Sequence, residues 1–272
     1  MRCFKLVFCL MTFANMARAD CQPVDFMSLP LPQTGDPVEI ALESAYPGAD
    51  LDLAAGTFRT PDGNVIPYAP AREVRPATRL NGATLGDMFT YVYPLDFDLT
   101  SRRTAWFDPG RVRDEAFFQA LYFDNEASAA ASLATVAYTG PAQSIRFSMT
   151  TKLCVATQLA AALARINTMA TNFDPYFKDS GGSFNWRVIA GTDRLSSHSF
   201  GTAFDLNTTL GGYWRWTRSA EGQVTEYDNK IPETLVREFE RFGFIWGGKW
   251  NHFDGMHFEY RPELILYSRL MD

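Results

Sequence analysis

All three histidines of this 272-residue chain lie in its last third, and two of them stand in short motifs that also contain carboxylates. Residues 196–205 contain His198, and residues 254–259 contain His257. Two imidazoles and one carboxylate are a common ligand set for a catalytic zinc ion, which keeps a fourth position for water. The motifs therefore predict a zinc site. This site constrains the fold, because two distant segments of the chain must meet there.

We expect the three zinc ligands to be His198, Asp205 and His257. The first two are seven residues apart, which is too far for one helical turn and suits a loop that runs into a strand. Gly201 lies between them and permits a tight backbone turn, while Ala203 leaves room beside the metal. His257 is expected to come from a separate strand.

A further carboxylate beside the second motif is available for proton transfer. Zinc makes water more acidic, but amide hydrolysis also needs a base that takes a proton from water and passes it to the leaving amine. Asp254 precedes His257 by three residues, close enough for one turn to present both. Glu259 competes for this role, but on a strand it would share the face of His257, so we expect it to support that ligand instead.

An oxyanion that forms at the attacked carbonyl needs a positive partner besides the metal. Arg187, on a predicted strand over residues 186–190, is our first candidate. Arg194 is the second candidate, with a surface role as its alternative. His252 matches no ligand position. It is interpreted either as a substrate-binding or supporting residue, or as a histidine bonded within the loop 250–253.

The two motifs together resemble those of the zinc D-Ala-D-Ala carboxypeptidase and L-alanyl-D-glutamate endopeptidase family. That family includes VanX-like and VanY-like enzymes and phage endolysins. The resemblance covers roughly residues 145–265, and the positions that carry it are Ser196, His198, Gly201, Ala203, Asp205, Asp254 and His257. It implies a hedgehog/DD-peptidase fold, a zinc cofactor and cleavage of peptidoglycan stem peptides.

The resemblance also implies roles for single residues. It supports the three zinc ligands and Asp254 as the catalytic base, and it gives Arg187 the role of steadying the transition state. Ser196 matches a serine that contacts the substrate. The VanX-like branch has Glu as the base, whereas Asp254-Gly-Met-His257 is similar to the endopeptidase and endolysin branch. A strict D-Ala-D-Ala dipeptidase is therefore not expected.

The predicted elements indicate an α+β fold, with helices packed against a mostly antiparallel sheet. Helices are predicted to begin at Asp108, at Thr150 or Thr151, and at Pro232. Strands are predicted over residues 186–190, 202–206, 244–246 and 256–260, with a hairpin whose turn is 61–63. Three parts follow along the chain, namely a signal peptide (1–19), an N-terminal accessory extension (20–125) and the zinc peptidase core (126–272). The arginines of the extension (Arg102, Arg103, Arg111 and Arg113) are interpreted as solvated charges.

Residues 1–19 have the basic start, apolar segment and small residues of an export signal, with cleavage near Ala19. We therefore expect a periplasmic or secreted protein. The apolar segment is shorter than the roughly 20 residues of a membrane span, and no stable membrane anchor is expected. Cys21 and Cys154 would remain as an even pair, either a disulfide or two buried thiols.

The formal net charge is −6, and loss of the three basic residues in 1–19 would change it to −9. An acidic chain of this kind argues against nucleic acid as a partner, because nucleic-acid binding requires clustered Lys and Arg. The leading hypothesis is a zinc metallopeptidase acting on peptidoglycan peptides, as a carboxypeptidase or an endopeptidase. The alternative is a catalytically silent zinc-containing module that binds the cell wall or a partner. The presence of Asp254 favours the enzyme.

Overall fold

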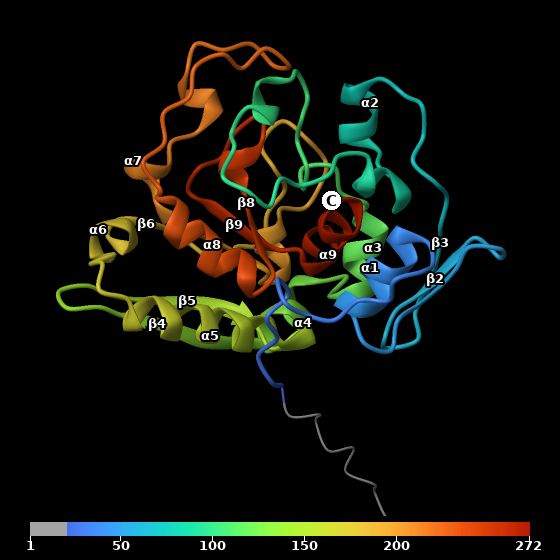
Figure 1. Ribbon diagram of the computed structural model, residues 1–272, viewed down its shortest axis with the longest axis horizontal. Coiled ribbons are helices and arrows are strands. Elements are labelled where there is room, and N and C mark those ends of the chain that lie inside the picture. The colour runs from blue at the N-terminus through green and yellow to red at the C-terminus, as the bar shows by residue number, and fades with distance from the viewer. Residues whose placement is uncertain (1–20) are drawn as a thin grey trace, which may run out of the picture.

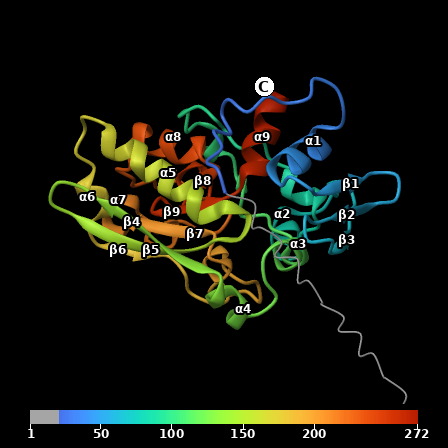
Figure 2. The same cartoon turned by 90° about the horizontal axis from the view of Figure 1, so that it is seen from below.

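The structure of the protein is a computed structural model that describes residues 21–272, so the predicted signal peptide (1–19) lies outside the described residues. Within this range the chain forms three antiparallel sheets with helices packed around them (Figures 1 and 2). The predicted α+β class, with antiparallel sheets and packed helices, is confirmed. No helix in the described part of the chain is both long and apolar enough to cross a membrane.

The element bounds are as follows. The strands are β1 (Asp50–Asp52), β2 (Thr57–Arg59), β3 (Val65–Pro67), β4 (Leu133–Thr139), β5 (Ser144–Thr150), β6 (Ser180–Gly182), β7 (Ala203–Asn207), β8 (Phe244–Trp246) and β9 (His257–Tyr260). The α-helices are α1 (Pro37–Ala45), α2 (Pro76–Asn81), α3 (Glu115–Leu121), α4 (Glu126–Ala131), α5 (Val155–Thr168), α6 (Asp174–Phe177), α7 (Thr208–Gly211), α8 (Glu233–Arg241) and α9 (Pro262–Met271).

The sheet that carries both motifs has the strand order β6-β7-β9-β8. In its centre, Asp205 lies directly opposite His257, and Phe204 lies opposite Phe258. Successive side chains of a strand point to opposite faces. One face of this strand pair therefore presents the two polar side chains. The other presents the stacked rings of Phe204 and Phe258, 5.4 Å apart, to Phe239 of α8.

One hydrophobic cluster includes residues from both the N-terminal extension and the predicted peptidase core. Helix α1 packs beside α9, as both views show (Figures 1 and 2). A buried polar contact joins them, because the Tyr46 hydroxyl at the end of α1 donates a hydrogen bond to Glu263 at 2.6 Å. The extension is thus packed into the same interior as the sheet that carries the motifs.

Most of the predicted elements are present. The hairpin is β2–β3, the strands at 202–206, 244–246 and 256–260 correspond to β7, β8 and β9, and the predicted helix from Pro232 is α8. The helix predicted from Thr150 or Thr151 begins later, at Val155, after a short 3₁₀ turn.

Two predicted elements are wrong. No helix begins at Asp108, because its carboxylate accepts a hydrogen bond from the backbone N–H of His252 at 2.8 Å instead of capping a helix. The helix in this region is α3, and Asp114 caps it by accepting from the N–H of Ala116 at 2.9 Å. The segment 186–190 is extended, but within the described residues it pairs only through a single bridge between Val188 and Leu195.

The arginines of the extension also differ from the prediction. Arg103 is exposed as expected, but Arg102 is only 4% exposed, and its guanidinium lies 4.0 Å from the ring centre of Tyr227. The side chains of Arg111 and Arg113 are 16% and 12% exposed, and both line a cavity of the C-terminal part. Sequence spacing alone could not reveal these long-range partners.

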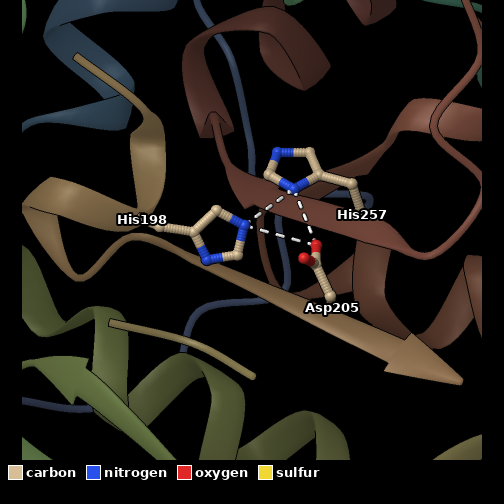
Figure 3. A group of neighbouring side chains, drawn as sticks. All are labelled: His198, Asp205 and His257. Atoms are coloured by element: carbon tan, nitrogen blue, oxygen red, sulfur yellow. Dashed lines mark hydrogen bonds and ion pairs between the residues drawn. The ribbon is translucent and has the colours of Figure 1, made fainter. Parts of the chain in front are cut away.

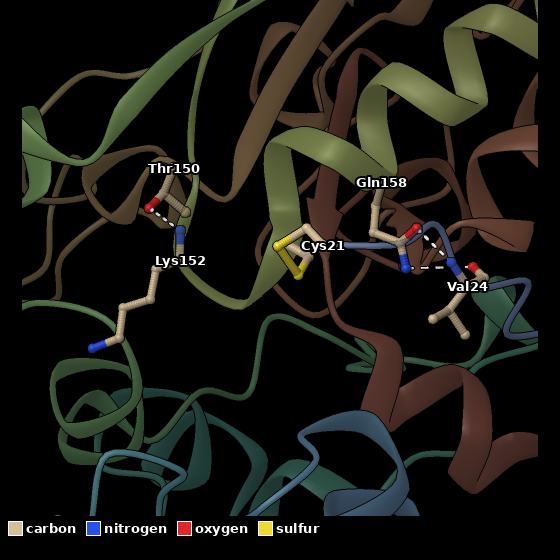
Figure 4. Close-up of a disulfide and its surroundings, with 6 residues drawn as sticks. Cys21, Val24, Thr150, Lys152 and Gln158 are labelled. Carbon is tan, nitrogen blue, oxygen red and sulfur yellow. Dashed lines mark hydrogen bonds between the residues drawn. A yellow bond between two sulfur atoms is a disulfide. The ribbon is translucent and has the colours of Figure 1, made fainter. Parts of the chain in front are cut away.

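A disulfide joins Cys21 to Cys154, which decides between the two alternatives for these residues (Figure 4). The amide of Gln158 on α5 adds two hydrogen bonds to the backbone of Val24, at 3.0 and 3.3 Å. The disulfide joins residues that are 133 positions apart in the sequence and so closes a long loop. Closing a loop of this length removes much conformational freedom from the unfolded chain.

We predict that replacing both Cys21 and Cys154 by Ser lowers the free energy of unfolding by about 2–5 kcal/mol, because the unfolded chain regains the entropy that the cross-link removes. Urea denaturation measures the change. Reductant should destabilise the unchanged protein to a similar extent and leave the double variant unaffected. Equal denaturation midpoints with and without reductant would contradict the prediction.

Candidate metal centre

Three different elements position the predicted ligands. His198 lies in a 3₁₀ turn (Ser197–Phe200), Asp205 on β7 and His257 at the start of β9. The turn ends at Gly201, whose φ is 66°. A Cβ there would lie 3.0 Å from the backbone nitrogen of Thr150, so glycine satisfies both the left-handed conformation and the close approach.

The three side chains converge on one point (Figure 3). His257 Nδ1 lies 2.9 Å from Asp205 Oδ1 and 3.2 Å from His198 Nε2, and the remaining side, from His198 Nε2 to Asp205 Oδ1, is 3.3 Å. Tetrahedral zinc with bonds of about 2.0–2.1 Å separates its ligand atoms by about 3.3 Å. The donor triangle therefore has nearly the size that a tetrahedral zinc ion requires.

Outer hydrogen bonds select the ring nitrogen that each histidine offers. His198 Nδ1 lies 2.5 Å from the carbonyl oxygen of Ser183, which can only accept, so this nitrogen carries a proton and Nε2 is left as the ligand atom. His257 Nε2 lies 3.2 Å from Glu259 Oε2 and donates to that carboxylate, which leaves Nδ1 for a metal. The expected supporting contact of Glu259 is thus present.

Two arginines hold Glu259. Arg113 Nη1 lies 3.0 Å from one of its oxygens, and Arg261 Nη1 lies 3.2 Å from the other. Burial alone raises the pKa of Glu259, but Arg113, His257 and Arg261 outweigh it and hold the pKa well below its usual range. Glu259 therefore stays ionised and can keep the His257 ring oriented.

The donor atoms also change one another's protonation. Burial raises the pKa of Asp205, but the two imidazoles more than offset this and lower it. Burial lowers the pKa of His257, but the carboxylates of Asp205, Glu259 and Asp254 outweigh burial and raise it to about 10. In the protein without a metal ion, His257 is thus a cation at neutral pH, and a metal must displace its proton.

The donor triangle opens into a cavity of about 270 Å³. Asp254 lines this cavity and is joined to His257 by a turn in which its carbonyl accepts the N–H of His257 at 3.1 Å. Its Oδ1 is buried and has no hydrogen-bond partner among residues 21–272. Burial raises the pKa of Asp254, although His257 opposes this. A carboxylate that is free of strong partners and destabilised as an anion suits a general base.

Of the other predicted site residues, Ser196 and Arg187 line the cavity and Arg194 does not. Ser196 lines the cavity and caps the turn that carries His198, whose N–H it accepts at 3.4 Å. Arg187 also lines the cavity, from the extended segment, where its carbonyl accepts the N–H of Ser196 at 2.9 Å. Arg194 lies outside the cavity and donates to the carbonyl of Arg111 at 3.1 Å.

His252 lies in a buried network outside the cavity lining. Its Nδ1 lies 2.6 Å from Asp108 Oδ2, and its Nε2 accepts the N–H of Gly222 at 2.7 Å. Both ring nitrogens are therefore occupied, and Trp106 and Trp214 cover the ring edge-on. His252 is thus a buried, fully bonded histidine away from the cavity wall, and its ring partners lie outside the loop 250–253.

Sequence reasoning missed the contribution of the N-terminal extension. Arg111 and Arg113 line the cavity together with the motif residues. Arg111 Nη2 lies 3.9 Å from Asp254 Oδ2, and its guanidinium stacks over Trp250 at 4.8 Å. Neither arginine belongs to a spacing pattern with the motifs. The only available signal was their place in a Pro- and Gly-rich segment with little regular structure of its own.

Residues 190–260 match a model of an M15 peptidase family that is described as D-alanyl-D-alanine carboxypeptidase. The match covers about a quarter of the chain and includes the donor triangle and Asp254. It supports a peptidase of this family type and leaves the N-terminal extension without a counterpart. No curated protein and no solved structure matches the chain.

We predict that Glu259→Gln weakens metal binding about 10- to 100-fold, because the neutral amide holds the His257 ring less firmly. Competition against a chromogenic chelator measures the affinity. Glu226→Gln, at an exposed carboxylate, is the matched control and should bind as the unchanged protein does. Unchanged affinity in a folded Glu259→Gln variant would argue against the supporting role.

We also predict that zinc binding at neutral pH releases about one proton, because the raised pKa keeps His257 protonated until the metal takes Nδ1. Apparent affinity should therefore increase about tenfold for each pH unit between about 6 and 8. Calorimetry in buffers with different ionisation enthalpies counts the proton. An enthalpy that does not depend on the buffer would contradict the prediction.

Proposed function

We propose that the protein is an exported zinc peptidase that hydrolyses an amide bond in peptidoglycan stem peptides. The observation that carries this proposal is the Asp254 carboxylate, whose buried Oδ1 has no hydrogen bond among the described residues and which shares a cavity with the donor triangle. The family match supports a peptidase, and its description supports the substrate class. The Cys21–Cys154 disulfide supports export, because disulfides persist in oxidising compartments.

The donor set fits zinc in three respects, namely the size of the triangle, the fixed ring nitrogens and the side that opens into the cavity. His198, Asp205 and His257 would hold the ion. When bound, zinc supplies Lewis-acid chemistry that acidifies water and polarises a carbonyl.

Asp254 carries out the proton transfers in the proposed reaction. Its carboxylate accepts a proton from the attacking water, whose oxygen forms a bond to the carbonyl carbon of the substrate amide. The carbon–nitrogen bond then breaks, and Asp254 passes the proton to the leaving amine. The direct products are a carboxylic acid and an amine, with one water consumed, and transfer of the acid's proton to the amine then gives a carboxylate and an ammonium group.

The other cavity residues bind and orient the substrate. Arg187 brings a positive charge to the cavity and is suited to the oxyanion that develops during attack. Ser196 lines the same wall and supports the turn that presents His198. Its backbone N–H and carbonyl are engaged with Arg187 and Ser199, so its hydroxyl is the group that can donate a hydrogen bond to a peptide.

We predict that Asp254→Asn retains zinc but lowers turnover about 100-fold or more, because the amide cannot accept the proton from water. Metal content and release of peptide fragments from purified muropeptides, followed by mass spectrometry, test the two parts. Asp193→Asn, at an exposed position outside the cavity lining, is the control and should remain active. Full activity of Asp254→Asn would remove Asp254 from the mechanism.

The same muropeptide assay on the unchanged, zinc-loaded protein tests the function itself. Loss of a terminal D-Ala indicates a carboxypeptidase, and cleavage between L-Ala and D-Glu indicates an endopeptidase. Absence of any cleavage would contradict the proposal and favour a zinc-containing binding module.

A further inference from the structure

The side chain of Arg111 is fixed along one edge. Its Nε donates to the carbonyl oxygen of His252 at 2.8 Å, and its guanidinium carbon lies 4.8 Å from the ring centre of Trp250. His252 is itself fixed, because Asp108 accepts both its backbone N–H and its ring Nδ1–H. The guanidinium is therefore held in one orientation before any ligand arrives, which reduces the entropy that binding would cost.

The Nη2 group of Arg111 has no strong partner among residues 21–272, although the side chain lines the cavity. Within the described part of the chain, Nη2 is buried and has no hydrogen bond, and the nearest carboxylate oxygen, Asp254 Oδ2, is 3.9 Å away. This separation is too long for a hydrogen bond. A guanidinium that is preorganised and keeps Nη2 without a hydrogen bond is suited to binding a carboxylate.

Other cations near the cavity are less available. Arg113 is engaged with Glu259, and burial together with Arg113 and Arg111 lowers the pKa of Arg194 to about 10, while its side chain turns to the carbonyl of Arg111. Arg187 is more exposed than Arg111 and lines the cavity from the extended segment 186–190. Arg111 is thus a largely buried cation next to the base, with Nη2 free of hydrogen bonds among the described residues.

The distance from Arg111 to Asp254 fits a terminal carboxylate. Asp254 must approach the leaving nitrogen of the scissile amide. In a substrate with one residue after that bond, the terminal carboxylate is attached to the next Cα, within about 4 Å of this nitrogen. A guanidinium 3.9 Å from the base is placed to bind that group. A substrate with further residues beyond the scissile bond would have to place them where the Arg111 side chain lies.

We propose that Arg111 binds the free carboxylate of the substrate's last residue, so that the site releases a single C-terminal amino acid. The inference rests on the proposed peptidase function and narrows it to a carboxypeptidase. Water adds to the carbonyl of the penultimate residue, the amide bond breaks, and the terminal residue leaves as a free amino acid that takes its amine proton from Asp254. Arg111 lies outside residues 190–260, so the family match assigns it no role.

The first test compares an acyl-D-alanyl-D-alanine peptide with its C-terminal carboxamide. The unchanged protein should prefer the acid about 10- to 100-fold in kcat/KM, as expected for a charged hydrogen-bonded pair. Arg111→Met should lose this preference mainly through a higher KM for the acid. Arg111→Lys keeps the charge and should retain part of it, and Arg103→Met, at an exposed arginine, should behave as the unchanged protein.

A binding measurement separates this inference from the proposed function. In zinc-loaded Asp254→Asn, calorimetry with N-acetyl-D-alanyl-D-alanine and with its amide reports recognition of the carboxylate without turnover. The acid should bind about tenfold or more tightly than the amide, and Arg111→Met in the same background should remove the difference. This holds whether or not the unchanged protein cleaves muropeptides.

Two results would overturn the inference. Equal binding or equal cleavage of acid and amide by the unchanged protein would mean that no terminal carboxylate is recognised. An equal loss of kcat for acid and amide in Arg111→Met, with the preference kept, would mean that Arg111 acts on Asp254 or on the reacting carbonyl instead. If the protein cleaves no peptide but still binds the acid more tightly than the amide, the proposed peptidase function is contradicted and the role of Arg111 in binding the carboxylate is not.

Discussion

The buried carboxylate of Glu259 is the contact on which the candidate site depends. One of its oxygens receives His257 Nε2 and Arg113, and the other receives Arg261. A buried charge of this kind is tolerated only when it is paired and hydrogen-bonded. Loss of any partner would leave a charge in the interior and loosen the His257 ring. The metal centre is therefore built on an ionic network that extends well beyond the three ligand atoms.

That network explains why the N-terminal extension belongs to the site. The short segment from Asp108 to Arg113 reaches it at three points, because Asp108 fixes His252, Arg111 borders Asp254 and Arg113 neutralises Glu259. The buried contact between α1 and α9 and the disulfide at Cys21 fasten other parts of the extension to the body. A chain reduced to the region that matches the family model would lack these supports, and Glu259 would have lost both of its arginines.

The sequence was most informative where spacing and chemistry coincide. The motif residues around His198 and His257 converge in the structure, and strands β7, β8 and β9 and helix α8 lie near their predicted positions. Long-range partners were not predictable. Asp108 has the character of a helix cap, but its carboxylate is used by His252, far along the chain. Arg111 and Arg113 look like surface charges until the fold supplies their carboxylates. Local patterns report periodicity and turns, whereas such pairs depend on tertiary structure.

The pairing of Asp205 with His257 across β7 and β9 has a consequence for folding. A slip of one residue between these strands would turn one ligand toward the core and bring Phe204 or Phe258 to the polar face, because side chains alternate along a strand. Only the native alignment gathers the donor triangle. An ion that binds the triangle therefore stabilises the correctly aligned sheet over every misaligned one. The cofactor of the proposed reaction would thus also favour the native register of β7 and β9 during folding.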